Sequence, residues 1–395
     1  MEELSDQIIQ EQNPDRNPTS NLNPLRAMVT AVGTFFCIAA MAAFCYNFIL
    51  SSGTKTADPQ VKAADVAIMD KYDMVVTNKI SDALDGVLSI EKVYWLSDSD
   101  LVAPEPNPGG YGKVKTAEEL DWLLEEAADL IGGQTMVFSK DRPIWNLSDI
   151  YYYYDETILV ITWKEVVDNC VYTFSEVKIA HPSQFRRFLA GGEFGSDKQY
   201  RTTEMAASVN AVLASSGDFY GYRKYGIVAY GGELRRFESE MVDTCYINDD
   251  GDLLFTYRGQ IQTEEEARKF IEDNNVRFSL AFGPVMLDNG EVMVPWDYAL
   301  GEVNGTYSRA AICQMDKLHY LVANTSREGT LFKRHSVRFF AEYIRGLGCK
   351  TAYALDGGQT TAIVMDDKLV TTPDWQTQRR ISDIIYFATA LPDGG

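Results

Sequence analysis

The chain has 395 residues, of which 46% are hydrophobic and 24% are charged, and its formal net charge is −21. This length and composition allow one large or two ordinary globular domains with a full hydrophobic core, and they argue against wholesale disorder. The acidic balance argues against nucleic acid as a partner, because a polyphosphate is bound by clustered cations.

The first distinctive segment is an uncharged run from Ala27 to Leu50. As a helix it would be roughly 36 Å long, enough to cross a bilayer with some tilt. A cleaved signal peptide is the alternative, but the leader of 26 residues contains five acids and makes a poor basic n-region. We therefore predict a disordered tail at 1–26 and an uncleaved, single-pass membrane anchor at 27–50. Charges flanking the run are nearly balanced, so they do not orient it.

Residues 56–150 are predicted to be a helical juxtamembrane region. Apolar residues recur at helical spacing over 59–90, and a Pro- and Gly-rich loop follows at 103–112. Thr116 and Glu119 then form a capping box, which opens a helix that ends at Gly132-Gly133.

Residues 151–395 are predicted to form an α+β domain, a mixed β-sheet with peripheral helices. Helices are expected at 203–210, 263–274 and 336–345. Strands are expected at 150–163, 170–179, 211–215, 226–230, 253–257, 278–287, 351–355, 361–365 and 381–387, and a hairpin at 309–323 turning at Met315-Asp316-Lys317.

The spacing of cysteines and histidines gives no metal site. His181, His319 and His335 have no metal-ligand spacing, so a zinc enzyme is not expected, although an oxygen-ligated divalent cation is left open. Neither a P-loop nor a dinucleotide fingerprint is found, and no cofactor is predicted. The four cysteines outside the apolar run allow three disulfide pairings, among which the sequence does not choose: Cys170, Cys245, Cys313 and Cys349.

Acids and arginines gather where predicted strands begin or end. Ser216 to Gly221 follows one strand, Tyr307 to Ile312 begins another, and Asp356-Gly357-Gly358 follows a third. Paired glycines let backbone N–H groups converge on an anion, and an aspartate at such a turn can exchange a proton. Asp-Gly-Gly is also an ordinary hairpin turn, which is the structural alternative.

The order and spacing of these segments resemble the phosphodiester glycosidase family over about 171–390. The matching segments are Ser216 through Tyr220, Ser308 through Cys313, Leu355 through Thr360, and Arg380 ahead of the last strand. The sequence departs from the family pattern at Ser216, Ser308, Ala310, Cys313, Gln359 and Thr360. The acids and the arginine of the pattern are kept.

The resemblance implies an exported hydrolase that cleaves, or transfers from, a sugar-1-phosphodiester, in an envelope polysaccharide or glycolipid. It places the domain at 151–395 outside the cell and the tail inside. Two carboxylates commonly serve glycosidic cleavage, and here they would be Asp218 and Asp356. Arg309 is the first candidate to neutralise the phosphate.

Further substrate-binding candidates accompany these three catalytic ones. They are Gly357, Gly358, Gln359 and Thr360 in the turn, Arg380, Tyr220 as a flat surface for a sugar, and His181 as a proton carrier or a histidine satisfied by backbone. The alternative function is a cell-surface protein that uses the same fold to bind or assemble glycan without catalysis.

Overall fold

The computed structural model describes residues 102–138, 150–295, 307–331 and 333–391, together with residues 298, 303 and 305. The chain divides into two compact units, Met1–Asp58 and Pro59–Gly395, and every described residue belongs to the second. The predicted tail, the anchor at 27–50 and the helix at 59–90 lie outside the described residues. Within the described ranges, no helix has both the length and the apolar character needed to cross a membrane.

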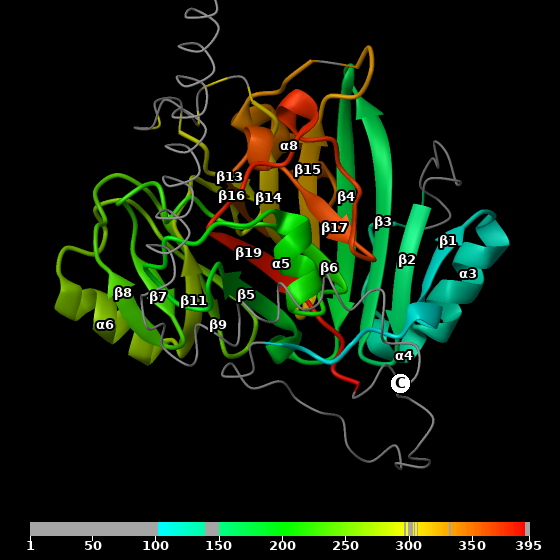
Figure 1. Ribbon diagram of the computed structural model, residues 1–395, viewed down its shortest axis with the longest axis horizontal. Helices are drawn as coiled ribbons and strands as arrows, with labels where there is room; N and C mark the ends of the chain where they lie inside the picture. The colour runs from blue at the N-terminus through cyan, green and yellow to red at the C-terminus, as the bar shows by residue number, and fades with distance from the viewer. Residues whose placement is uncertain are drawn as a thin grey trace, which may run out of the picture. The chain divides into compact units, whose positions relative to one another are not determined.

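The described strands form three sheets (Figure 1). The nine-stranded sheet has the order β1 (Tyr111–Val114), β2 (Ile150–Asp155), β3 (Ile158–Val167), β4 (Cys170–Ile179), β15 (His319–Ser326), β14 (Ala310–Asp316), β16 (Thr351–Leu355), β12 (Val285–Asp288) and β13 (Glu291–Val292). A five-stranded sheet has the order β10 (Leu253–Thr256), β9 (Thr244–Asn248), β11 (Val276–Leu280), β7 (Val228–Tyr230) and β8 (Glu233–Arg236). The other has the order β18 (Lys368–Leu369), β17 (Ile363–Met365), β6 (Leu213–Ser216), β19 (Asp383–Phe387) and β5 (Phe185–Leu189).

The α+β class is confirmed, but the prediction of a mixed sheet is wrong. All pairings between the described strands are antiparallel. The hairpin of β14 and β15, which turns at 316–318, shows why: short loops join antiparallel neighbours, whereas parallel neighbours need a long crossover.

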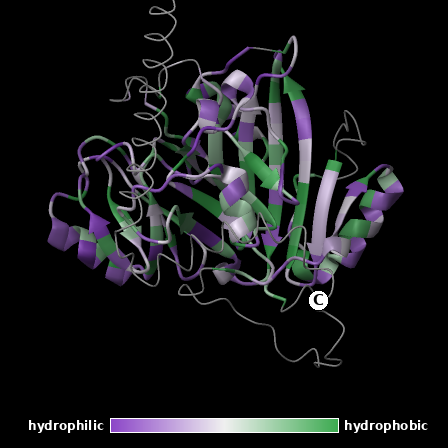
Figure 2. Cartoon of the chain, in the orientation of Figure 1, coloured by the Kyte–Doolittle hydropathy of each residue, from purple (hydrophilic) through white to green (hydrophobic). Residues whose placement is uncertain are grey.

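The helices begin where their capping residues predict. The described helices are α3 (Ala117–Glu126), α4 (Ala128–Ile131), α5 (Thr202–Ser208), α6 (Glu264–Asp273) and α8 (Val337–Gly346), with 3-10 turns η1 (Pro108–Gly110), η3 (Pro182–Gln184), η4 (Gly358–Thr360) and η5 (Asp374–Gln376). Thr116 Oγ1 accepts the Glu119 N–H at 3.2 Å, and Gly132 ends α4 in the left-handed conformation. Helix α6 is largely hydrophilic (Figure 2), because only Ala267 and Ile271 of its residues are buried.

Two predicted strands are each two strands in the structure. The run at 150–163 turns at Glu156-Thr157 between β2 and β3. The run at 278–287 is broken at Gly283-Pro284, and its halves β11 and β12 belong to different sheets. Proline has no N–H to give to a strand ladder, which explains the break. The strands that were not predicted are β1, β5, β8, β9, β13 and β18, and β1 lies in the region that was predicted to be helical.

The core is shared by the three sheets. The Phe185 ring of β5 lies 5.6 Å from Phe278 of β11, 5.1 Å from Tyr320 of β15 and 4.6 Å from Phe387 of β19, measured between ring centroids. Rings at such distances pack favourably and exclude water. Strand ends of the nine-stranded sheet and of the sheet with β6 are thereby held in fixed positions next to each other.

Candidate active site

Three strand ends meet at one place in the fold. Ala310 at the start of β14 pairs with Leu355 at the end of β16, so Arg309 and Asp356 leave their strands side by side. The Asp356 N–H donates to the Gly217 carbonyl at 3.1 Å, and the Ser216 hydroxyl donates to the Asp356 carbonyl at 3.2 Å. These two bonds tie the end of β6 to the end of β16. The strand-end clustering that the sequence predicts is present.

The segment Asp356-Gly357-Gly358 is a crossing between sheets, and not the hairpin turn that its composition also allows. It leads from β16 of the nine-stranded sheet to β17 of another sheet. A Cβ on Gly357 would lie 2.3 Å from the Ser308 carbonyl oxygen, which leaves room only for glycine. Gly358 has φ +69°, and its N–H donates to the same carbonyl at 2.8 Å. That N–H is therefore engaged and does not face an anion.

A cavity of about 310 Å³ opens at these strand ends. Of the residues proposed from the sequence, it is lined by Asp356, Arg309, Gly357, Gly358 and Gln359. It is also lined by residues that the sequence analysis missed as site residues, chief among them Arg223, Tyr307, Trp375 and Arg379. Apolar side chains from α8 and β12 complete its wall, including Met286, Val337 and Phe340.

Asp356 has an unusual environment for a carboxyl group. The residue exposes only 9% of its surface, and its Oδ2 has no hydrogen-bond partner among the described residues. Burial raises its pKa to about 7, although the nearby charges of Arg223 and Arg379 act in the opposite direction. A carboxyl that titrates near neutral pH in a cavity has the properties of a general acid or base.

Arg309 brings a positive charge to the cavity wall. Its Nε donates to the His335 carbonyl at 3.2 Å, and its Nη2 donates to the Gly305 carbonyl. Burial lowers its pKa to about 10, so it remains charged at neutral pH. Both contacts are carbonyl oxygens, which orient the guanidinium without neutralising it.

Arg223 is a second buried cation in this wall. Its Nη1 donates to the Phe282 carbonyl at 3.2 Å, and the guanidinium lies 4.3 Å from the centroid of the Phe282 ring. Its Nε and Nη2 are buried and have no hydrogen-bond partner among the described residues. Unsatisfied buried donors are costly, and a ligand that accepts hydrogen bonds would remove this cost.

Of the adjacent residues Arg379 and Arg380, the sequence analysis proposed Arg380, but Arg379 is the one that lines the cavity. The Arg379 guanidinium lies 4.4 Å from the Tyr222 ring centroid and 5.3 Å from that of Phe219, and it lines the cavity. Arg380 is exposed and does not line it, and its carbonyl accepts the Tyr222 hydroxyl at 3.0 Å. Stacking on these rings holds Arg379 over the loop that follows β6.

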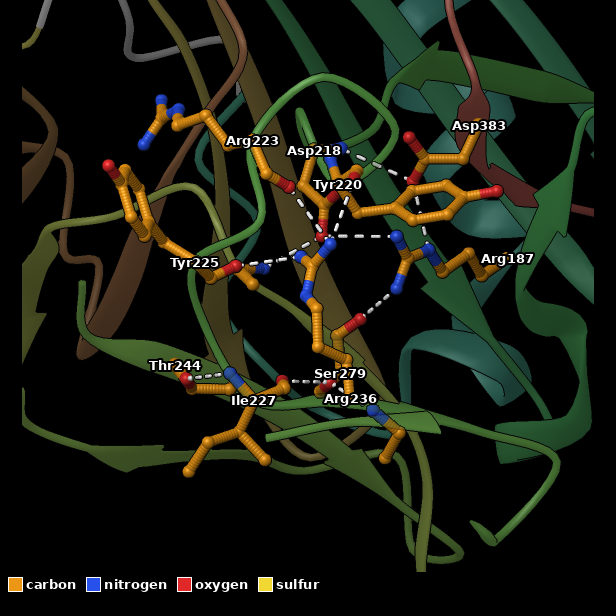
Figure 3. Close-up of polar contacts among 12 residues, drawn as sticks. Arg187, Asp218, Tyr220, Arg223, Tyr225, Ile227, Arg236, Thr244, Ser279 and Asp383 are labelled. Atoms are coloured by element: carbon orange, nitrogen blue, oxygen red, sulfur yellow. Dashed lines mark hydrogen bonds and ion pairs between the residues drawn. The ribbon is translucent and has the colours of Figure 1, made fainter. Parts of the chain in front are cut away.

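Asp218 lies in a separate buried cluster, shown in Figure 3, and does not line the cavity. Its Oδ1 accepts the Tyr220 N–H at 2.7 Å, and its Oδ2 accepts the Ala281 N–H at 2.7 Å and pairs with Arg187 Nη2 at 3.0 Å. Arg187 also pairs through Nε with Asp383 Oδ2 at 2.8 Å, and the three side chains have no exposed surface. Burial, together with the charge of Asp218, raises the pKa of the Asp383 carboxyl. Neither Arg187 nor Asp383 was predicted.

Arg236 connects this cluster with the cavity. Its Nη1 donates to the carbonyls of Tyr220 at 2.8 Å and Arg223 at 2.9 Å, and its Nη2 donates to that of Tyr225 at 2.7 Å. In Figure 3 its guanidinium lies among these carbonyls, and the Arg223 side chain points away from the cluster. The loop at 218–225 is thus held by Asp218 at its start and by Arg236 along its length.

The remaining candidates divide between the cavity and other places. Gln359 lines the cavity and its Nε2 donates to Thr377 Oγ1 at 3.0 Å, while the Thr360 hydroxyl donates to the Gly357 carbonyl at 2.8 Å. Tyr220 is buried and stacks on Phe194 at 5.3 Å between ring centroids.

His181 does not line the cavity either. Its Nδ1 caps η3 by accepting the Ser183 N–H at 3.2 Å.

The four described cysteines, Cys170, Cys245, Cys313 and Cys349, are all free thiols. Among the described residues, no group of three or more His, Cys, Asp or Glu side chains is arranged to hold a metal ion.

Residues 209–388, which run from β6 to β19 and include the whole set of arginines around Asp356, match the sequence profile of the phosphodiester glycosidases. The segment at 209–388 is thus similar to the phosphodiester glycosidase family. The resemblance inferred from the sequence is confirmed.

Two solved structures resemble part of the chain. The auto-inhibited catalytic domain of zebrafish N-acetylglucosamine-1-phosphodiester alpha-N-acetylglucosaminidase is 15% identical, with a TM-score of 0.46 over 58% of this chain and 82% of that one. A hypothetical protein from Synechocystis is 13% identical, with a TM-score of 0.46 over 59% of this chain and 62% of that one. Because both scores are below 0.5, the similarity to the family rests on the sequence match at 209–388. No curated protein is significantly similar to the chain.

Proposed function

We propose that this phosphodiester glycosidase domain hydrolyses the glycosidic bond of a sugar-1-phosphodiester, and that Asp356 is its catalytic base. One observation carries the proposal: a buried carboxyl with a free oxygen and a pKa of about 7 shares a cavity with three arginines. Positive charge suits the phosphate, and the carboxyl suits proton transfer to or from water.

The arginines would hold the phosphate and stabilise it as a leaving group. Among the described residues, Arg223 has two donors without partners, and the side-chain hydrogen bonds of Arg309 go to the carbonyls of His335 and Gly305. When the bond between the sugar C1 and the bridging oxygen breaks, the electron pair goes to that oxygen, and the product is a phosphomonoester. Guanidinium groups neutralise the charge that develops there, so no separate general acid is required.

Asp356 would act on the attacking water. Above its pKa of about 7 the carboxylate accepts a proton from water, whose oxygen forms the new bond to C1.

Asp218 was expected to be a second catalytic carboxylate. Both of its oxygens are engaged with backbone N–H groups and Arg187, and we assign it the role of positioning the loop that carries Arg223.

The cellular setting that we propose follows from the sequence. The uncharged run at 27–50 would anchor the protein in the cell membrane, with the domain outside the cell. The substrate would then be an envelope polysaccharide or a glycolipid that carries a sugar-1-phosphodiester.

The test is turnover of a panel of sugar 1-(methyl phosphates) by the full chain in detergent, with free sugar and methyl phosphate followed by mass spectrometry. We expect release that rises with pH up to about pH 7 and then levels, because the base must be deprotonated. Asp356→Asn should lose roughly 10²- to 10⁴-fold in kcat while folding normally. Activity unchanged in Asp356→Asn would refute the assigned base, and binding of the panel without any release would favour a glycan-binding protein.

A further inference from the structure

Two aromatic side chains stand exposed where the cavity opens. Trp375 exposes 67% of its surface and Tyr307 exposes 42%, and both line the cavity that contains Asp356. Most aromatic side chains of the described residues are buried or half-buried, and exposing an indole to water forgoes much of its hydrophobic stabilisation. On the basis of the proposed function, we infer that Trp375 is the platform on which the sugar ring of the phosphodiester stacks, with Tyr307 beside it.

The neighbouring residue fixes the position of Trp375. The Asp374 carboxylate is buried, and its Oδ1 accepts the Ser308 hydroxyl at 2.9 Å and Arg334 Nη2 at 3.0 Å. Its Oδ2 accepts the Ser308 N–H at 3.1 Å. Ser308 directly precedes Arg309, so these bonds fasten the indole to the same strand start that presents the phosphate-binding guanidinium.

The backbone at Trp375 is held in a conformation that bulky residues avoid. Trp375 has φ 60° and ψ 13°, and Gln376 also has φ 60°. Left-handed backbone at a bulky residue is unfavourable and persists only where the surroundings fix it, often at ligand clamps. Here the buried Asp374 fixes it. The strained turn keeps the ring exposed over the cavity, although burial against the protein would stabilise it more.

The combination of rings and arginines indicates the kind of group that would occupy the platform. A pyranose has apolar C–H faces and a polar edge, so one face stacks on an aromatic ring while its hydroxyls stay in water. Phosphate bound by Arg223 and Arg309 would bring the attached sugar next to the cavity opening. The chain therefore recognises the phosphate by charge and the sugar by stacking, and Trp375 determines how tightly the sugar part is held.

The experiment measures binding and not turnover, so it is independent of whether hydrolysis occurs. Full-length Asp356→Asn protein is titrated calorimetrically with gluco-, galacto- and manno-configured sugar 1-(methyl phosphates), and the tightest binder is compared with dimethyl phosphate, which has no sugar. Adding Trp375→Ala should weaken the sugar diester about tenfold and leave dimethyl phosphate within about twofold. Trp375→Phe should restore most of the affinity, because it keeps a flat ring.

Trp122 supplies the matched control. It is another exposed tryptophan, with 53% of its surface accessible, but it lies on α3 and does not line the cavity. Trp122→Ala should leave both ligands unaffected.

Three outcomes would overturn the platform: equal affinity of Trp375→Ala and its parent for the sugar diester, equal weakening of both ligands, or no binding of either ligand by the parent. If the sugar diester binds in a Trp375-dependent way but wild-type protein never releases sugar, the platform stands and the hydrolase proposal fails.

Discussion

Two groups of buried charges lie on either side of the loop at 218–225, and they differ in how completely they are paired. In the cluster of Arg187, Asp218 and Asp383, two ion pairs of 3.0 and 2.8 Å join the side chains. In the cavity, Asp356 has a free Oδ2, and Arg223 has two donors without partners among the described residues. The first group pairs its charges with one another, although Asp383 Oδ1 makes no hydrogen bond among the described residues. The second group has no such ion pairs and faces the cavity.

Whether a buried charge is paired distinguishes structural residues from catalytic ones more reliably than residue type does. Both groups combine aspartate with arginine at strand ends. A paired buried charge stabilises local structure and is strongly destabilising to break, whereas an unpaired one reduces stability and persists where function requires it. On this basis Asp356 and Asp218 should respond to substitution in opposite ways.

Removing Arg187 should produce the largest loss of stability. Arg187→Met leaves Asp218 buried without its cation, and we expect the free energy of unfolding to fall by about 3–5 kcal/mol. Urea unfolding at pH 7 measures this loss. The kcat per folded molecule should fall much less than in Asp356→Asn, because Arg187 does not line the cavity and affects it only through the loop that starts at Asp218. A stable Arg187→Met protein without activity would instead place the cluster in the catalytic machinery.

Substituting Asp356 should increase the free energy of unfolding, whereas substituting Arg187 should decrease it. Its pKa is about 7 in the folded protein against an ordinary value of 3.8, so the folded state holds this proton more tightly. Wild-type stability should therefore fall as pH rises from about 4 to 7, and remain lower above that window. Asparagine does not titrate, so Asp356→Asn should exceed wild type by roughly 2–4 kcal/mol at pH 8, and by much less at pH 4.

Asp218→Asn is the matched comparison for that measurement. It weakens a buried ion pair and should destabilise the protein in the same urea titration at pH 8. If both asparagine variants lose stability to the same extent, the distinction between the two groups of charges does not hold.

Removing one cavity arginine should reduce catalysis with little change in stability. Arg223→Met takes away the two free donors, and we expect kcat to fall about 100-fold, as when one donor to a developing negative charge is lost. Arg380→Met is the control, since Arg380 is exposed and does not line the cavity. Equal losses in both variants would indicate a general effect of charge and not a phosphate contact.

The sequence was sufficient to place Asp356 and Arg309 at strand ends, because both adjoin strands that pattern and flanking residues define. Once Ala310 pairs with Leu355, the two candidates must lie close together. Helix starts were predictable for a similar reason, since a threonine followed by a glutamate three residues later is a local signal.

Side-chain direction in loops was not predictable. Asp218 and Arg223 occupy the same short loop, but one side chain is buried in the cluster and the other lines the cavity. At Arg379-Arg380, adjacent residues have opposite environments. Strand β5, with Arg186 and Arg187 both buried, has no alternation of polar and apolar residues that would identify it as a strand. In each case the burial depends on contacts distant in sequence.

Arg236 offers the finest test, because it belongs to neither group of charges but holds the loop between them. Arg236→Gln removes donors to the carbonyls of Tyr220, Arg223 and Tyr225, and should let the Arg223 side chain leave its position. We expect about a tenfold lower kcat/KM, smaller than the effect of removing Arg223 itself.

A double-mutant cycle distinguishes positioning from an independent role of Arg236. If Arg236 acts only through Arg223, then Arg236→Gln should have almost no further effect on kcat/KM in an Arg223→Met background, and the coupling free energy should be about 1.4 kcal/mol. Additive losses would mean that Arg236 contributes by another route, such as the net charge near Asp218. Full coupling would show that Arg236 serves catalysis by holding the loop in the conformation that directs the Arg223 side chain to the cavity.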